Sequence, residues 1–521
     1  MVRVRTTSAL VAAVAAVLVW AAAPAAQQFG SITFPTSGAP AAQEAFLTGV
    51  KALHNFQFDE AAVAFQAAQK ADPNFALAYW GEAMSHNHPL WAQQDLAKAK
   101  AVLDRLAPTH EARLAKATLP KEKALLEAMQ TLYFSPGDKL TRDLAYANQM
   151  ARLYEQYPGD HEIGTFYALS LLGSVRPGDA GFRRQALAAS IAEKIFAANP
   201  KHPGAAHFVI HAFDDPDHAP LALEAANAYA KIAPSAAHAL HMPSHIYVQR
   251  GMWEQVALSN IDAYKAAVDL NAKLKLPEGR EDFHTLGWLG YAHLMLGKFD
   301  EAKKNVEAAK GAADRNPNAA NIRDGYLGMR ARYIQETAQW EKLALPAAPA
   351  AAAAGGEHAG MPGMAMPGNA MGVSEGAASW VYIVGVSAAK LGDMATAEAA
   401  EAQLKGFRER AAAGPNAYAA RPHAIREQEL GAIIRWAKGQ KDEALAFAKR
   451  ATEVEVTMAA PSGPPEPIKP AFELYGELLA EAGRDKEAAA AFEQALLRTP
   501  NRTPSVKGLQ KVQAKLGTSM R

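Results

Sequence analysis

The feature that most constrains the fold of this chain is a set of small residues that recurs with one spacing. The segment that starts at Lys469 carries Gly476, Gly483, Ala488, Phe492, Ala495 and Pro500. The segment that starts at Ala42 repeats the pattern with Gly49, Phe58, Ala61, Phe65, Ala68 and Pro73. A third copy starts at Phe283, and partial copies start at Pro203, Ala237, Ala378 and Ile425. Repetition at one period indicates a chain of similar units, each of which packs against its neighbours.

These spacings resemble the tetratricopeptide repeat, a helix-turn-helix of 34 residues in which small residues let two helices pack closely. The resemblance covers most of residues 40–515. It implies an all-α fold, a right-handed solenoid of antiparallel helix pairs with a concave inner surface. Helices of less regular sequence are predicted between the copies, at Asp95–Leu106, Lys121–Tyr133, Thr141–Tyr157, His161–Leu172, Ala180–Ala198 and Asp324–Lys342.

One segment interrupts the helical pattern and divides the chain. Residues 345–372 read LPAAPAAAAAGGEHAGMPGMAMPGNAMG, in which proline and glycine are too frequent for a continuous helix. We expect a disordered insert there. It would separate an N-terminal helical block at 40–344 from a C-terminal block at 373–515.

The N-terminus has the layout of an export signal. Arg3 and Arg5 precede an apolar stretch over Ala9–Ala23, and small residues follow at Ala23-Pro24-Ala25. We predict a signal peptide at 1–25 and a periplasmic or secreted protein. The alternative is an uncleaved anchor, because the apolar stretch approaches the roughly 18 residues of a short membrane span. No later stretch is apolar enough to span a membrane, so none is expected after cleavage.

Composition narrows the classes of partner and metal ligand. Hydrophobic residues are 50% of the chain, enough for an extensive core. The 54 lysines and arginines balance 53 acidic residues, which argues against nucleic acid as a partner. The chain has no cysteine, so any metal must be held by His, Asp, Glu or Met.

Histidines gather in one part of the chain. Of 16 in total, seven lie between His202 and His245. In the tetratricopeptide pattern, the same few positions of the first helix face the concave groove in every repeat. By that register the residues expected in the groove are His207, His211, Asp214, His238, His241, His245 and His284.

Three interpretations of these histidines stay open. Imidazoles at i and i+4 can bind one ion, so His207 with His211 and His241 with His245 could form a copper or zinc site, with Asp214 as a further ligand. Alternatively the groove is metal-free and its imidazoles hydrogen-bond a peptide or a small acid. The third interpretation is structural, with histidines satisfied between helices. A metal site requires nitrogens that reach one point at about 2.0 to 2.1 Å.

The sequence contains no complete catalytic constellation. His207–His211 and His241–His245 both lack the glutamate that follows the first histidine in zinc proteases. A G-x-S-x-G elbow and a phosphate-binding loop are absent as well. Enzymatic activity is therefore not indicated, although a histidine-held ion that polarises water would supply one route to it.

Two further groups are candidate sites. The insert carries thioethers and one imidazole, which suit copper(I): His358, Met361, Met364 and Met366. The alternative is a low-complexity linker. In the last repeat, Glu473 and Glu477 share one groove face by the same register, which hints at a basic partner, although a solvated helical face is commoner.

Taken together, these patterns predict an exported scaffold that binds a protein or peptide segment in its concave, histidine-rich groove. Solenoids of this type use that face for extended partners. The second hypothesis is a periplasmic copper or zinc protein, or a metal-dependent enzyme, that uses the histidine cluster.

Overall fold

A computed structural model describes residues 28–517 except 177, 180, 348–372 and 415. The predicted signal peptide at 1–25 and nearly all of the predicted insert lie outside the described residues. So do the copper candidates His358, Met361, Met364 and Met366. No helix in the described part of the chain is long and apolar enough to cross a membrane.

The N-terminal third of the chain consists of helices and one small pair of strands. The helices are α1 (Pro40–His54), α2 (Phe58–Ala71), α3 (Ala76–Met84), α4 (Leu96–Leu106), α5 (His110–Lys116), α6 (Pro120–Phe134), α7 (Lys139–Gln156), α8 (His161–Gly173) and α9 (Arg183–Ala198). Between α3 and α4, β1 (Asn87–His88) pairs antiparallel with β2 (Gln93–Gln94) around the short 3₁₀ helix η1 (Pro89–Trp91). The sequence pattern did not predict these strands.

The middle third carries most of the clustered histidines. Its helices are α10 (Pro203–Ala212), η2 (Ala219–Ala222), α11 (Leu223–Ile232), α12 (Ala237–His241), α13 (Pro243–Gln249), α14 (Trp253–Leu274), α15 (Glu281–Met295), α16 (Phe299–Arg315) and α17 (Ala320–Thr337). The predicted repeat starts at Pro203 and Ala237 coincide with the first residues of α10 and α12. Pro243 divides the first helix of the Ala237 repeat into α12 and α13, because proline lacks the N–H that a continuous helix needs.

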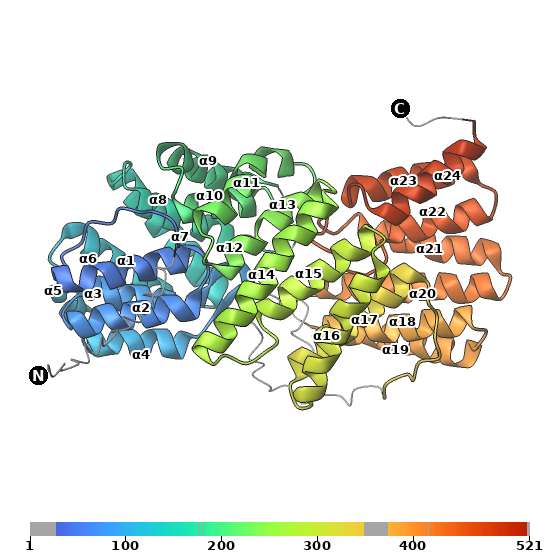
Figure 1. Cartoon of the computed structure of the whole chain (residues 1–521), viewed down its shortest axis with the longest axis horizontal. Coiled ribbons are helices and arrows are strands. Elements are labelled where there is room, and N and C mark those ends of the chain that lie inside the picture. Colours follow the sequence, from blue (N-terminus) through green and yellow to red (C-terminus); the bar gives the residue numbers. More distant parts are fainter. Residues whose placement is uncertain (1–27, 177, 180, 348–372, 415, 518–521) are drawn as a thin grey trace, which may run out of the picture.

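The C-terminal third continues the same pattern. Its helices are α18 (Glu375–Lys390), α19 (Met394–Ala412), η4 (Ala417–Ala420), α20 (Arg421–Ala437), α21 (Lys441–Glu455), α22 (Ala471–Glu481), α23 (Asp485–Arg498) and α24 (Thr503–Lys515). Consecutive helices pack side by side from one end of the elongated molecule to the other (Figure 1). The predicted all-α solenoid of helix pairs is confirmed.

The small residues of the repeat allow this close packing. The Phe65 ring lies between Gly49 on α1 and Gly81 on α3, where a Cβ atom would lie 2.8 Å and 2.2 Å from the ring. Phe492 lies in the same way against Gly508 on α24, with 2.4 Å to a Cβ there. Any larger side chain would force these helices apart, so the repeated glycines determine the tetratricopeptide-like spacing.

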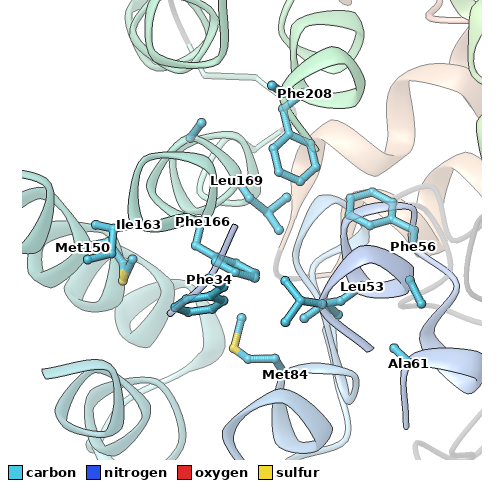
Figure 2. Close-up of a cluster of buried hydrophobic side chains, with 14 of the residues drawn as sticks. Phe34, Leu53, Phe56, Ala61, Met84, Met150, Ile163, Phe166, Leu169 and Phe208 are labelled. Atoms are coloured by element: carbon cyan, nitrogen blue, oxygen red, sulfur yellow. The ribbon is translucent and has the colours of Figure 1, made fainter. Parts of the chain in front are cut away.

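The N-terminal block also departs from a simple solenoid, since helices far apart in the sequence meet. α1 packs against α10, and the backbone of Ser31 donates to the carbonyl of Lys201 at 2.9 Å. Figure 2 shows the resulting core, in which Leu53 of α1, Phe166 and Leu169 of α8 and Phe208 of α10 face one another. This closure brings the end of α1 beside the histidines of α10.

The second large core crosses the predicted boundary between the blocks. Ala331 and Ile334 of α17 belong to the same hydrophobic cluster as Ala378 and Val381 of α18. The helices on the two sides of the predicted insert therefore pack against each other directly. The division at 345–372 is a break in the sequence pattern and does not separate two cores.

Candidate metal centre

Four helices bring six histidines together. His207 and His211 lie on α10, one turn apart. His238 and His241 lie on α12, His245 follows on α13, and His284 lies near the start of α15. His207 and His211, four residues apart, share one face of α10, and His238 and His241, three residues apart, share one face of α12. We call these six side chains the histidine cluster and divide it into two trios.

The second trio consists of His241, His245 and His284. The Nε2 atom of His241 lies 3.0 Å from Nε2 of His245 and 2.8 Å from Nε2 of His284. One nitrogen of each of the three lies within 4.8 Å of the others. Two nitrogens that bind one ion at about 2.1 Å are at most about 4.2 Å apart, so small rotations of the rings bring all three onto one ion.

Acceptors on neighbouring elements fix the proton positions of two of these rings. The Nδ1 atom of His245 lies 2.6 Å from the Asp214 carboxylate, and Nδ1 of His241 lies 2.7 Å from Oδ1 of Asn260 on α14. The amide of Asn260 donates to the carbonyl of Val256, so its oxygen faces His241. Both imidazoles therefore donate through Nδ1, and each directs the lone pair of Nε2 toward the centre of the trio.

The first trio consists of His207, His211 and His238. Nε2 of His207 lies 3.2 Å from Nε2 of His238, and Nδ1 of His207 donates to the carbonyl oxygen of His54 at 2.7 Å. Nδ1 of His238 lies 3.2 Å from a carboxylate oxygen of Glu281. Nε2 of His211 is buried and has no hydrogen-bond partner among the described residues.

The two trios adjoin each other. The ring centroids of His211 and His245 are 6.1 Å apart, and those of His238 and His241 are 6.3 Å apart. All six rings thus form one continuous assembly that is supported by α10, α12, α13 and α15.

Aromatic side chains form the walls of this assembly. The Trp288 ring contacts His241 and His245 at centroid distances of 4.9 Å and 4.4 Å. On the other side, the Phe56 ring lies 4.4 Å from His207 and 5.3 Å from His238. These contacts limit the rotation of the imidazoles and keep them away from bulk water.

Burial favours the neutral form of four of these imidazoles. His207 and His241 are fully buried and His238 is 5% exposed, whereas His211, His245 and His284 are partly buried. Burial lowers the pKa of His207, His211 and His241 well below its ordinary value, and it lowers the pKa of His284 to about 4. A neutral imidazole is the form that binds a metal ion.

A third group of ligand-type side chains lies behind the first trio. Glu162 on α8 accepts from Nε2 of His54 at 2.6 Å and from Nε2 of His202 at 3.1 Å, and all three side chains are fully buried. Burial alone would raise the pKa of Glu162, but the two histidines lower it to about 2. The sequence register missed this group, because His54 and Glu162 lie in repeats far from α10.

Asp214 lies beside the histidine cluster, whereas the two glutamates of the last repeat pair with residues of the chain itself. Asp214 contacts His245, as described above, and its Oδ1 atom is buried without a hydrogen-bond partner. Glu473 is fully buried and pairs with Lys469 at 2.9 Å and with Arg502 at 2.8 Å. Glu477 pairs with Lys469 at 2.6 Å. The register placed Glu473 on an open face, and this is corrected, because the chain itself supplies its basic partners.

Several contributors to the site carried no signal in the sequence. Glu281, Asn260, Phe56 and Trp288 are ordinary residues of helices and turns when read one at a time. Glu281 precedes His284 by less than one helical turn, and that proximity is the single feature that could have suggested its role.

Comparisons with known proteins found distant likenesses among solved structures. No family model and no curated protein matches the chain. The APC/C hetero-tetramer Cut9–Hcn1 is 12% identical, over 92% of this chain and 78% of that chain, with a TM-score of 0.34. The human IFIT1 dimer with m7Gppp-AAAA is 11% identical, over 91% and 95%, with a TM-score of 0.34. The P58(IPK) TPR domain is 13% identical, over 91% and 98%, with a TM-score of 0.21. Likenesses this distant carry no argument about ligands or partners.

Proposed function

We propose that this protein binds a transition-metal ion through His241, His245 and His284. The observation that carries the proposal is the meeting of the Nε2 atoms of His241 and His245 at 3.0 Å, while Nδ1 of each ring donates to another acceptor. Two lone pairs that face each other at this distance repel. A cation between them turns that repulsion into two favourable contacts.

The donor set favours zinc or copper. Imidazole nitrogen is a good ligand for both ions, and neither carboxylate nor carbonyl oxygen lies in the trio itself. Three histidine ligands leave a fourth position free, which is the arrangement of zinc sites that bind water or a substrate. A water at that position would have a lowered pKa, so the site could support hydrolysis as well as transport.

The burial of the cluster disfavours an extended peptide lying on these histidines. A peptide needs a strip of accessible side chains, whereas His207 and His241 have no exposed surface. Tetratricopeptide-like folds commonly act as protein-binding scaffolds, so a protein partner remains part of the proposal, on a surface other than the histidine cluster.

We also propose that the protein works outside the cytoplasm, on the strength of the predicted signal peptide at 1–25. Export would place the metal site outside the cytoplasm. Determination of the N-terminal residue of the protein purified from the periplasm tests this. A start near residue 26 is expected, and an intact Met1 in the cytoplasm would overturn it.

Metal analysis of the untagged full-length chain tests the metal proposal. The protein is stripped with a chelator, incubated with zinc or copper(II), desalted and analysed by mass spectrometry for bound metal. We expect bound metal in the wild type and a loss on the order of 100-fold in affinity in His245→Gln and His284→Gln. His110→Gln, a part-buried histidine that pairs with Glu127 far from the cluster, is the matched control.

The folded state of each variant is checked by circular dichroism and thermal denaturation. Folded His245→Gln and His284→Gln variants that keep the wild-type affinity would overturn the proposal. An equal loss of metal in His110→Gln would overturn it too, because the effect would then not belong to the trio.

A further inference from the structure

We infer that His207, His211 and His238 hold a second metal ion beside the first, so that the histidine cluster is a two-metal centre. This inference deepens the proposed function, since it concerns the same site and depends on metal binding there. It rests on the proton positions in the first trio, on an unpartnered nitrogen and on the distance between the trios.

The first argument concerns the contact between His207 and His238. A backbone carbonyl oxygen can only accept, so Nδ1 of His207 carries the proton in its hydrogen bond to His54. The Glu281 carboxylate likewise accepts from Nδ1 of His238. When both imidazoles are neutral, each has a single N–H, and both Nε2 atoms then bear lone pairs across the 3.2 Å between them. No hydrogen bond between neutral rings can form there.

The second argument concerns His211. Its Nε2 atom is buried and has no hydrogen-bond partner among the described residues, and a buried polar atom without a partner costs about 1 to 3 kcal/mol. One nitrogen each of His207, His211 and His238 lies within 4.8 Å of the others. One cation would satisfy all three nitrogens at once, whereas a proton would satisfy at most two.

The third argument concerns the backbone of Phe56. In five other repeats the turn between the two helices contains a glycine with positive φ, two residues after the first helix ends. These glycines are Gly251, Gly297, Gly392, Gly439 and Gly483. Phe56 occupies the corresponding position with φ of 53°, a conformation that costs a side-chain-bearing residue on the order of 1 kcal/mol. Its ring contacts all three histidines of the first trio. The residue with the strained backbone is thus the one whose ring supports the trio.

The arrangement of charge also fits two ions. Each trio has one carboxylate behind it, Asp214 at His245 and Glu281 at His238. With His211 and His245 only 6.1 Å apart between ring centroids, two dications would lie close together and repel. The two carboxylates would offset part of that repulsion.

Copper(II) titration of the full-length chain, stripped of metal, tests the inference. Bound copper is counted by mass spectrometry, and electron paramagnetic resonance reports whether the ions interact. We expect two copper ions per chain in the wild type, with a signal weakened or broadened by coupling. In His238→Gln and in His211→Gln we expect one ion per chain and the full signal of an isolated copper(II).

The outcomes separate this inference from the proposed function. One ion per chain in the wild type, lost in His245→Gln but kept in His238→Gln, would overturn the second site and leave the first intact. No bound copper in the wild type would overturn both. Two ions that persist in His238→Gln and in His211→Gln would place the second ion elsewhere. His211 is part-buried, so its variant keeps the test valid if His238→Gln does not fold.

Discussion

The same positions of the repeat carry opposite chemistry in two regions of this molecule. On α10 and on α12–α13 they carry His207, His211, His241 and His245, whereas on α22 they carry Glu473 and Glu477. The glutamates meet Lys469 and Arg502 of the same chain. No hydrogen bond in the described part of the chain joins the six clustered imidazoles to a lysine or an arginine.

This difference supports the proposal that the histidine cluster, and not the acidic region, binds a ligand. The acidic region is neutralised internally, because cations of the chain lie against its carboxylates. Burial would raise the pKa of Glu473, but Arg502 and Lys469 lower it to about 2. In the histidine cluster, lone pairs face lone pairs. We therefore regard the ion pairs of Glu473 and Glu477 with Lys469 and Arg502 as structural, and we propose the histidine cluster as the ligand site.

The largest effect is expected on the free energy of unfolding, when a glutamate of the buried ion pairs is removed. Glu473→Ala leaves Arg502, which is 1% exposed, with a buried charge that has lost a partner. We expect the free energy of unfolding to fall by about 3 to 5 kcal/mol in urea denaturation. Glu487→Ala, which removes an exposed pair with Arg484, should change it by less than about 1 kcal/mol. Equal effects of the two variants would mean that the buried network does not stabilise the fold.

The next largest effect is expected on metal affinity, when the carboxylate beside His245 is neutralised. Asp214→Asn keeps an oxygen near Nδ1 of His245 but removes the negative charge, so the imidazole becomes a weaker metal ligand. We expect a 10- to 100-fold loss of zinc or copper affinity, measured by competition with a chromophoric chelator, with little change in stability. The exposed Asp217→Asn is the matched control. An unchanged affinity in Asp214→Asn would remove this carboxylate from the site.

The smallest effect is expected on the pH dependence of stability, through a buried histidine of the C-terminal region that belongs to neither trio. Burial, together with Arg410, lowers the pKa of His423 to about 4. The unfolded chain binds a proton there below about pH 6.5, so the stability that the neutral form contributes is lost as the pH falls from 6.5 toward 4.

We therefore compare wild-type protein with His423→Gln, both stripped of metal, by urea denaturation at pH 7.5 and pH 5. Wild type should lose about 1 to 2 kcal/mol more than the variant between these pH values. The contribution of the histidine cluster is common to both proteins and cancels. An equal loss in the two would show that His423 is not held neutral by the fold.

Much of the fold could be predicted from the sequence, because the evidence for it is local. The repeat starts at Pro203 and Ala237 match the first residues of α10 and α12, and the glycines at Gly49 and Gly476 lie where helices touch. Helical period, proline and glycine act through the backbone of neighbouring residues, so a short window of sequence contains the information.

The candidate site was predictable only in part. The spacing predicted that His207 with His211, and His241 with His245, would each share one helix face. The first pair does so on α10, whereas the second pair is divided between α12 and α13. The role of Glu281, the support from Phe56 and the buried group around Glu162 depend on α1, α8 and α15 meeting α10 and α12. Those contacts join residues 40 to 153 positions apart, and no local pattern encodes them.

The sequence by itself therefore determined a helical repeat, the first residues of α10 and α12 and the clustering of histidine on these helices, because 3.6-residue periodicity is a property of the local backbone. The tertiary structure decided that α1 closes onto α10, that the imidazoles divide into two trios with their Nδ1 protons used elsewhere, and that Glu473 is already neutralised. Proton positions and charge partners are set by which atoms lie within hydrogen-bonding distance, and only the packed chain defines those distances.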